Sequence, residues 1–84
     1  MGYSVRIKRS AAKELQRLPR EMQRRLVEAI DRLANEPQAG SVLKGEFSGL
    51  RRLRVSTYRI IYEVHRGELT ILVVRVGHRQ SVYR

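Results

Sequence analysis

Residues 50–84 read LRRLRVSTYRIIYEVHRGELTILVVRVGHRQSVYR, and this stretch decides the fold. Runs of β-branched and aromatic residues at about 50–55, 58–65 and 68–76 predict three strands. The connections between the runs are only a few residues long, which suits antiparallel neighbours because parallel neighbours need a long crossover. The stretch therefore predicts an antiparallel sheet.

Two short turns set the register of this sheet. Ser56-Thr57 predicts a two-residue turn, and Arg66-Gly67 predicts a tight hairpin because glycine accepts positive φ. The expected cross-strand pairs are Arg54 with Arg59, Arg52 with Ile61, Arg59 with Val74, and Ile61 with Leu72. Directly opposed residues share a face of the sheet.

The register divides the three strands between two faces. The face expected to pack on the helices carries Leu53, Val55, Tyr58, Ile60, Tyr62, Val64, Leu69, Ile71 and Val73. The other face is mixed and carries Arg52, Arg54, Arg59, Ile61, Leu72 and Val74. A one-residue slip would exchange the faces and bury three arginines against the helices, at a high desolvation cost. We therefore expect the arginines to face away from the helices.

The first 35 residues predict a strand followed by a helical hairpin. Tyr3, Val5 and Ile7 alternate with polar residues, which is typical of a half-buried strand. Ser10 stands where a helix N-cap is expected, and Glu14 suits the positive end of the helix dipole. An apolar helical stripe follows at Leu15, Leu18, Met22, Leu26, Ile30 and Leu33.

Pro19 interrupts this stripe, so we expect two helices, at about 11–18 and 19–35. Glycines and Pro37 then predict a loop over 36–49. The order βααβββ predicts one α+β domain spanning 1–84. In it, an N-terminal strand and a two-helix hairpin pack on one face of a four-stranded antiparallel sheet.

Composition indicates an anionic partner. The 84 residues include 18 Lys and Arg against 8 Asp and Glu, for a formal charge of +10. Such a balance favours polyanions, and the excess of arginine over lysine favours nucleic acid, because guanidinium groups bind phosphate in a bidentate manner and stack on bases.

Several classes are excluded or disfavoured. The chain has no cysteine and only two histidines, His65 and His78, so disulfides are excluded and a zinc site is not expected. No apolar run approaches the roughly 20 residues that span a membrane, and MGYSVRIKRS lacks an apolar signal core. We expect a cytoplasmic protein with no metal, no cofactor and no membrane partner.

The ordered segments resemble a known family. LKGEFSGLRRLRVSTYRIIYEV, followed by VVRVGHRQSVYR, resembles the RelE/ParE superfamily, the toxins of type II toxin–antitoxin pairs. YSVRIKRSAAKELQRLP is similar to that family's first strand and helix. The most specific pieces are Leu43-Lys44-Gly45, the RLRV–YRIIYEV hairpin and the terminal VGHR–VY segment. The resemblance spans almost the whole chain and implies a RelE/ParE-like fold.

The RelE branch of this family comprises ribosome-dependent endoribonucleases, or mRNA interferases. These toxins cut mRNA in the ribosomal A site, with the 2′-hydroxyl of the mRNA as nucleophile, and so inhibit translation. The resemblance matches Arg52 and Arg54 to basic positions of the second strand, and Arg59 to the arginine of a Tyr-Arg pair. It also matches Arg79 to the arginine after the last strand and Tyr83 to the C-terminal tyrosine.

The resemblance therefore implies a site of charge stabilisation. The implied RNA-binding residues are Arg52, Arg54, Arg59 and Arg79, and the catalytic candidates are Arg54, Arg59, Arg79, Tyr83 and His78. Fixed guanidinium groups would stabilise the extra negative charge of a phosphorane, with Arg79 assisting the leaving 5′-oxygen. Tyr83 would stack on a base or orient the 2′-hydroxyl.

The residues matched to the family include no obvious general base. The type member carries lysines where this chain has Arg52 and Arg54, and arginine stays protonated. His78 is the nearest side chain that exchanges a proton near neutral pH. Its alternative role is that of a partly exposed histidine at a strand end, and Tyr83 is alternatively part of a frayed terminus.

Three functions stay open at this point. The first is the ribosome-dependent mRNA endonuclease. The second is a ParE-type inhibitor of DNA gyrase, and the third is an inactive module that binds an antitoxin. The basic and aromatic set favours the first, because ParE-type members tend to lack it. The arginines of the sheet face are alternatively antitoxin contacts or simply solvated.

The expected partners follow from the family and from charge. They are a small acidic antitoxin of the RelB kind, the ribosome and its mRNA. A basic surface on the N-terminal half would contact ribosomal RNA, since phosphate attraction is insensitive to sequence. Its residues are Arg6, Lys8, Arg9, Lys13, Arg17, Arg20, Arg24, Arg25 and Arg32.

Overall fold

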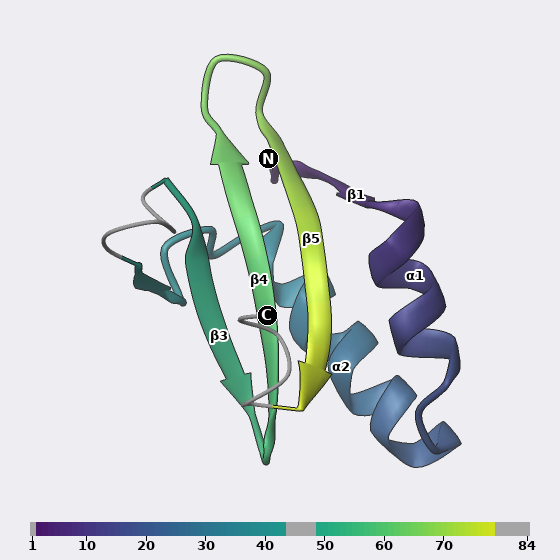
Figure 1. Ribbon diagram of the computed structural model, residues 1–84. Helices are drawn as coiled ribbons and strands as arrows, with labels where there is room; N and C mark the ends of the chain where they lie inside the picture. Colours follow the sequence, from purple (N-terminus) through teal and green to yellow (C-terminus); the bar gives the residue numbers. More distant parts are fainter. Residues whose placement is uncertain (1, 44–48, 79–84) are drawn as a thin grey trace.

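The computed structural model describes residues 2–43 and 49–78, and within them the strands form one five-stranded sheet (Figure 1). The elements in chain order are β1 (Ser4–Ile7), α1 (Arg9–Gln16), α2 (Arg20–Leu33), β2 (Ser41–Val42), β3 (Arg51–Val55), β4 (Tyr58–His65) and β5 (Thr70–His78). The order across the sheet is β1-β5-β4-β3-β2, and α2 lies behind it in Figure 1. The predicted α+β class is confirmed.

The sheet is mixed rather than wholly antiparallel, which corrects the four-stranded prediction. Strand β1 runs parallel to β5, with Ser4 opposite Thr70 and Ile7 opposite Val73. Strand β2, at the other edge, lies inside the stretch predicted as a loop. The alternation along β1 indicates which side chains are buried, but it does not specify the neighbouring strand. Two residues are too few for β2 to show a pattern at all.

The helices follow the predicted apolar stripe with shifted ends. Leu15, Leu26, Ile30 and Leu33 are buried in the core, as expected. The N-cap of α1 is Lys8, which makes no capping bond with its side chain, so the predicted Ser10 cap is wrong. Ser10 lies inside the first turn because β1 ends at Ile7 and the helix begins immediately afterwards.

The first hairpin is confirmed and the second is corrected. Val55 lies opposite Tyr58 across the Ser56-Thr57 turn, so Arg54 faces Arg59 and Arg52 faces Ile61 as predicted. Arg66-Gly67 does not form a two-residue turn, because His65 pairs with Thr70 across a four-residue loop. Leu69, rather than Gly67, adopts positive φ there, at 50°. Its carbonyl accepts a hydrogen bond from the Ser4 amide at 2.8 Å, which joins the loop to β1.

A bulge in β5 changes which residues face the core. Tyr62 lies opposite Val73, but Ile61 lies opposite Arg75, so Val74 is an extra residue on β5. The predicted pairing of Arg59 with Val74 is therefore wrong, since Arg59 lies opposite Gly77. The bulge reverses the alternation beyond it. Val76 is fully buried in the core, and Arg75 is kept out of it.

The Tyr62 hydroxyl fastens the segment after α2 to the sheet. It donates a hydrogen bond to the Pro37 carbonyl and accepts one from the Gly40 amide, each at 2.9 Å. The Arg51 guanidinium donates to the Gly40 carbonyl at 2.8 Å. Gly40 is also held close to β3, because a Cβ there would lie 2.6 Å from the Arg52 carbonyl oxygen.

Gly40→Ala should therefore lower the free energy of unfolding by about 1–3 kcal/mol, the usual cost of overpacking a closed site. Gly67→Ala is the matched control, since a Cβ at Gly67 meets nothing within 4 Å. Urea denaturation of the two variants beside the wild type measures the difference. Equal stability of the two variants would contradict the close approach at Gly40.

Candidate nucleic-acid interface

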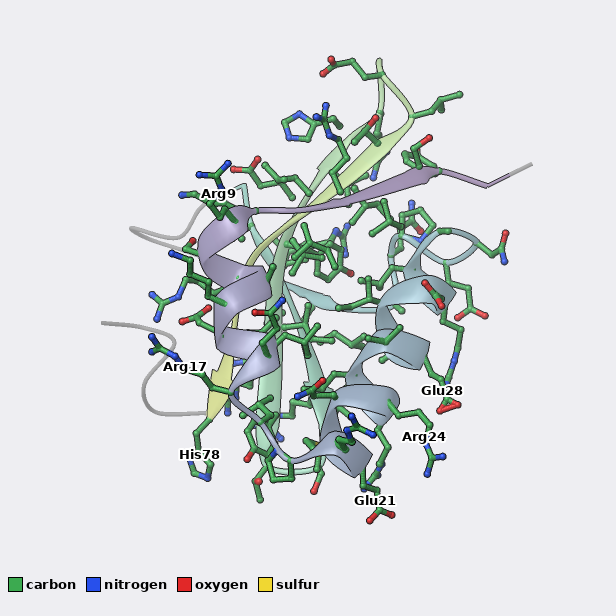
Figure 2. All side chains as sticks on the ribbon, turned by 90° about the vertical axis from the view of Figure 1, so that its right-hand side faces the viewer. Arg9, Arg17, Glu21, Arg24, Glu28 and His78 are labelled. Atoms are coloured by element: carbon green, nitrogen blue, oxygen red, sulfur yellow. The ribbon has the colours of Figure 1, made fainter. Side chains whose placement is uncertain are left out.

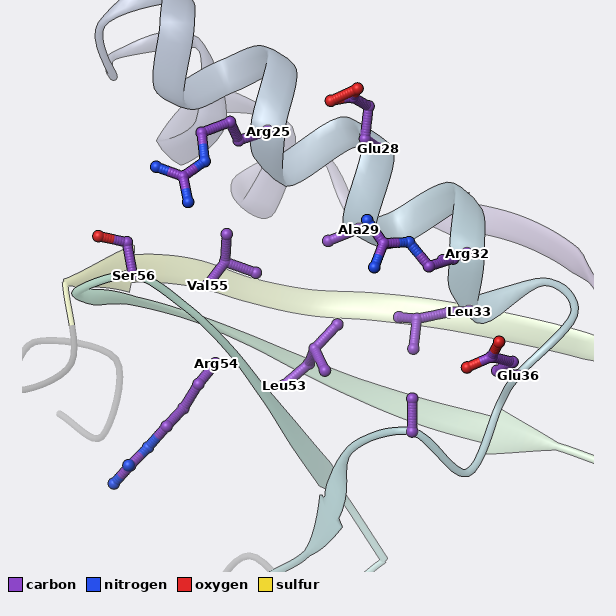
Figure 3. A pocket seen from close by; sticks show the side chains of 11 residues that line it. Arg25, Glu28, Ala29, Arg32, Leu33, Glu36, Leu53, Arg54, Val55 and Ser56 are labelled. Atoms are coloured by element: carbon purple, nitrogen blue, oxygen red, sulfur yellow. The ribbon is translucent and has the colours of Figure 1, made fainter.

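Three arginines of β3 and β4 lie on the sheet face turned away from α2, which we call the distal face. Arg52 and Arg54 are on β3, and Arg59 is on β4 directly opposite Arg54. Figure 3 shows Leu53 and Val55 pointing toward α2 while Arg54 points to the other side of the sheet. The expectation that these arginines face away from the helices is met by the observed register.

Two of the three arginines differ in exposure. Arg54 is exposed, whereas Arg59 is only 8% exposed, and Ile61 beside it is buried at 2%. Like charges directly opposite each other repel, so the Arg54–Arg59 pair costs free energy that an anion between them would offset. Burial strengthens the attraction of the Arg59 guanidinium for such an anion, because the local dielectric constant is low.

His78 lies in a neighbouring row and on the other side of the sheet. It is opposite Tyr58, and the two rings make an edge-on contact with centroids 5.8 Å apart at 78°. Because Tyr58 packs against the core, His78 follows the helix-side parity. It is exposed at the end of β5, as Figure 2 shows. The register thus does not bring His78 into the Arg54–Arg59 row.

Gly77 is the residue of β5 that completes this row, opposite Arg59. It has no side chain, so β5 adds no charged group to that row. Arg79 and Tyr83 lie outside the described residues, as do Lys44 and Gly45 of the family motif.

The basic surface predicted for the N-terminal half is solvent-exposed. Figure 2 shows Arg9, Arg17 and Arg24 projecting outward from the two helices, with Glu21 and Glu28 among them. All nine cations of this surface are exposed, namely Arg6, Lys8, Arg9, Lys13, Arg17, Arg20, Arg24, Arg25 and Arg32. They form a broad positive field beside the sheet.

A groove of about 370 Å³ runs between α2 and β3 (Figure 3). Its apolar lining comes from Ala29, Leu33, Ala39, Leu53 and Val55, and its charged lining comes from Arg25, Glu28, Arg32, Glu36 and Arg54. The sequence did not indicate this groove, since the helix and the strand that form it are about 20 residues apart. The groove lies between two cations of α2, Arg25 and Arg32, and Arg54 of β3.

Among residues 2–43 and 49–78, no three histidine, aspartate or glutamate side chains come together in a metal-binding arrangement. No helix in that part of the chain is long and apolar enough to cross a bilayer.

Comparison with known proteins identifies the family. Residues 5–83 match the family of the ParE toxin of the type II toxin–antitoxin system parDE. Toxin RelG of Mycobacterium tuberculosis is 35% identical over 86 residues, covering 100% of this chain and 99% of the relative. Toxin RelE of the same organism is 32% identical over 84 residues, covering 98% of this chain and 87% of the relative.

Solved structures agree with this assignment. The toxin–antitoxin complex RelBE2 from M. tuberculosis contains a chain with a TM-score of 0.89 and 32% identity, covering 94% of this chain and 100% of that one. The RelE–RelB complex of Pyrococcus horikoshii gives a TM-score of 0.78 and 34% identity, covering 96% and 99%. The chain therefore belongs to the RelE/ParE family of type II toxin–antitoxin toxins.

The Tyr62 hydroxyl yields a pH-dependent prediction. Burial raises the pKa of Tyr62, opposed by its bond from the Gly40 amide and by the charge of Arg51. A raised pKa in the folded state means that the contribution to stability is complete below about pH 10. It is lost as the pH rises through the higher folded-state pKa.

Tyr62→Phe should be less stable than the wild type by about 1–2 kcal/mol at pH 7, because the buried Gly40 amide loses its acceptor. This difference should shrink above about pH 10, since only the wild type loses the proton there. Urea denaturation of both proteins from pH 7 to pH 11 measures it. A difference that stays constant across the range would contradict the raised pKa.

Proposed function

We propose that this toxin is a ribosome-dependent mRNA endonuclease that cuts mRNA in the A site through attack by the 2′-hydroxyl. The observation that carries the proposal is the directly opposed pair Arg54 and Arg59, with Arg52 on the same face. Guanidinium groups placed together on one face can stabilise a phosphate whose negative charge increases during the reaction. The exposed cations of the helices supply the attraction for ribosomal RNA.

The proposed roles follow from this geometry and from the family. Arg54 and Arg59 would bind the non-bridging oxygens of the scissile phosphate and stabilise the phosphorane, and Arg52 would bind the adjacent phosphate. Arg79 would assist the leaving 5′-oxygen, and Tyr83 would stack on a base. The 2′-hydroxyl displaces the 5′-oxygen, so the products carry a 2′,3′-cyclic phosphate and a 5′-hydroxyl.

His78 is the proposed acid–base residue. It lies one row away from Arg59 and on the helix side of the sheet, at the end of β5, so a nucleotide would have to pass around the strand end to reach it. His78→Gln tests this role directly. A large loss of cleavage in this variant, with ribosome binding unchanged, would support the role, and full activity would contradict it.

A small acidic antitoxin is the proposed partner that silences the toxin. The solved structures of relatives include toxin–antitoxin complexes, RelBE2 from M. tuberculosis and RelE–RelB from P. horikoshii. The groove between α2 and β3 has an apolar floor that suits the apolar anchors of an antitoxin segment, and both arginines and glutamates line its sides. Isolation of the chain as a soluble, non-toxic monomer without a partner would count against this proposal.

Inhibition of DNA gyrase is the second candidate, because the matching family is described by its ParE toxin. A gyrase assay discriminates the two. Stalled gyrase with intact mRNA would replace the first proposal by the second.

The decisive experiment maps mRNA 5′ ends after the purified chain is added to a defined translation reaction. Arg54→Gln should slow cleavage on the order of a hundredfold, as expected when one donor to the transition state is removed. Arg79→Ala and Tyr83→Ala test the two residues after β5. Cuts that require ribosomes and follow the codon phase are the expected wild-type result.

Arg54→Gln should also raise the stability of the free toxin by about 0.2–1 kcal/mol, because it relieves the repulsion across the strands. Arg66→Gln is the matched control, since Arg66 is also exposed but lies in the loop just beyond the far end of β4. It should change neither cleavage nor stability. An Arg54→Gln variant with full activity would sink the proposed role of the arginine pair.

A further inference from the structure

Strand β5 extends beyond its neighbour on one edge. Strand β1 ends at Ile7 opposite Val73, and the last bond between them runs from the Lys8 amide to the Val73 carbonyl at 2.9 Å. Strand β5 continues to His78. From there on α1 rather than a strand lies alongside β5, as Figure 1 shows.

Glu14 of α1 takes the place of the missing strand. Its Oε1 accepts a hydrogen bond from the Val76 amide at 2.9 Å, so a side-chain carboxylate satisfies a backbone group that a strand carbonyl would otherwise bind. Its Oε2 accepts from Arg75 Nε at 3.1 Å and from Arg75 Nη2 at 3.0 Å. One carboxylate thus holds the backbone and the side chain of consecutive residues.

These contacts lie directly after the bulge at Val74. Without the bulge, Arg75 would face the core and Val76 the distal face, so this segment has two competing phases. The Glu14–Arg75 pair is half-buried, with side-chain exposures of 28% and 34%, which protects it from full solvent screening. Binding both residues selects the phase in which Val76 is buried.

We propose that Glu14 is a positioning residue that fixes the end of β5 against the arginine row. Two residues beyond Arg75 stands Gly77, opposite Arg59, and then His78. If β5 changed phase, a different residue would stand opposite Arg59. The effect on catalysis rests on the proposed function, whereas the effect on register does not.

The test compares Glu14→Ala with Glu14→Gln and with Tyr62→Phe. Glu14→Gln keeps an oxygen acceptor for the Val76 amide and loses only the ion pair with Arg75. Most molecules of this variant should therefore keep the pairing of Gly77 with Arg59. Glu14→Ala loses both contacts. Tyr62→Phe is the control for general destabilisation, because it weakens the fold at Gly40, away from Glu14.

Two readouts are needed, at a temperature where all variants are folded. NMR should show that the contacts of Gly77 with Arg59 and the slow exchange of the Val76 amide are lost in Glu14→Ala alone. In Glu14→Ala, the cleavage rate at saturating ribosomes should fall about tenfold to a hundredfold, because small displacements of reacting groups slow a reaction by such factors. The half-saturating ribosome concentration should be unchanged. Glu14→Gln should keep a rate close to that of the wild type.

Other outcomes overturn the inference. An intact pairing of Gly77 with Arg59 in Glu14→Ala refutes the proposed positioning role of Glu14, whatever the cleavage rate. A lost register with an unchanged rate refutes the link to the site. If the wild-type chain cleaves no mRNA, the proposed function fails. The positioning role of Glu14 is then judged on the NMR result alone.

Discussion

The alternation of side chains along β4 is the constraint on which the rest of the structure depends. Ile60 and Tyr62 are fully buried between the sheet and the helices, and Arg59 and Ile61 alternate with them on the distal face. A shift by one residue would exchange an aliphatic and an aromatic side chain for a guanidinium in the core, which is far more costly than any loss of a surface contact. The arginines are thus placed by the burial of their neighbours, and β3 follows because Arg54 must then face Arg59.

The two edges of this sheet are finished in different ways. At one edge, Tyr62, Gly40 and Arg51 tie the segment after α2 to β3 and β4 by three hydrogen bonds. At the other edge, Glu14 binds β5 where β1 has ended. In both places a polar side chain, Tyr62 or Glu14, satisfies backbone groups that have no partner strand. Both places are near the distal-face arginines, since Gly40 lies against Arg52 and Gly77 lies opposite Arg59. The rigidity of the site therefore comes from its margins as well as from its core.

Concentrated positive charge has a cost in a chain this small. With a formal charge of +10 over 84 residues, the free protein carries strong self-repulsion, and the opposed pair Arg54 and Arg59 adds a local term. An anionic partner offsets both. This couples stability to binding, because whatever binds only the folded chain stabilises it by mass action.

The sequence by itself determined the two helices, every strand except β2, and the faces of β3 and β4, because burial imposes a period of two on strands and 3.6 on helices. The apolar stripe, the three C-terminal strands, the first turn and the Arg54–Arg59 pair followed from local pattern alone. The parallel neighbour of β1, the four-residue loop and the bulge at Val74 depended on contacts between distant segments. Only the tertiary structure placed Glu14 against Val76 and turned His78 out of the arginine row, since one extra residue in β5 reverses every face that follows it.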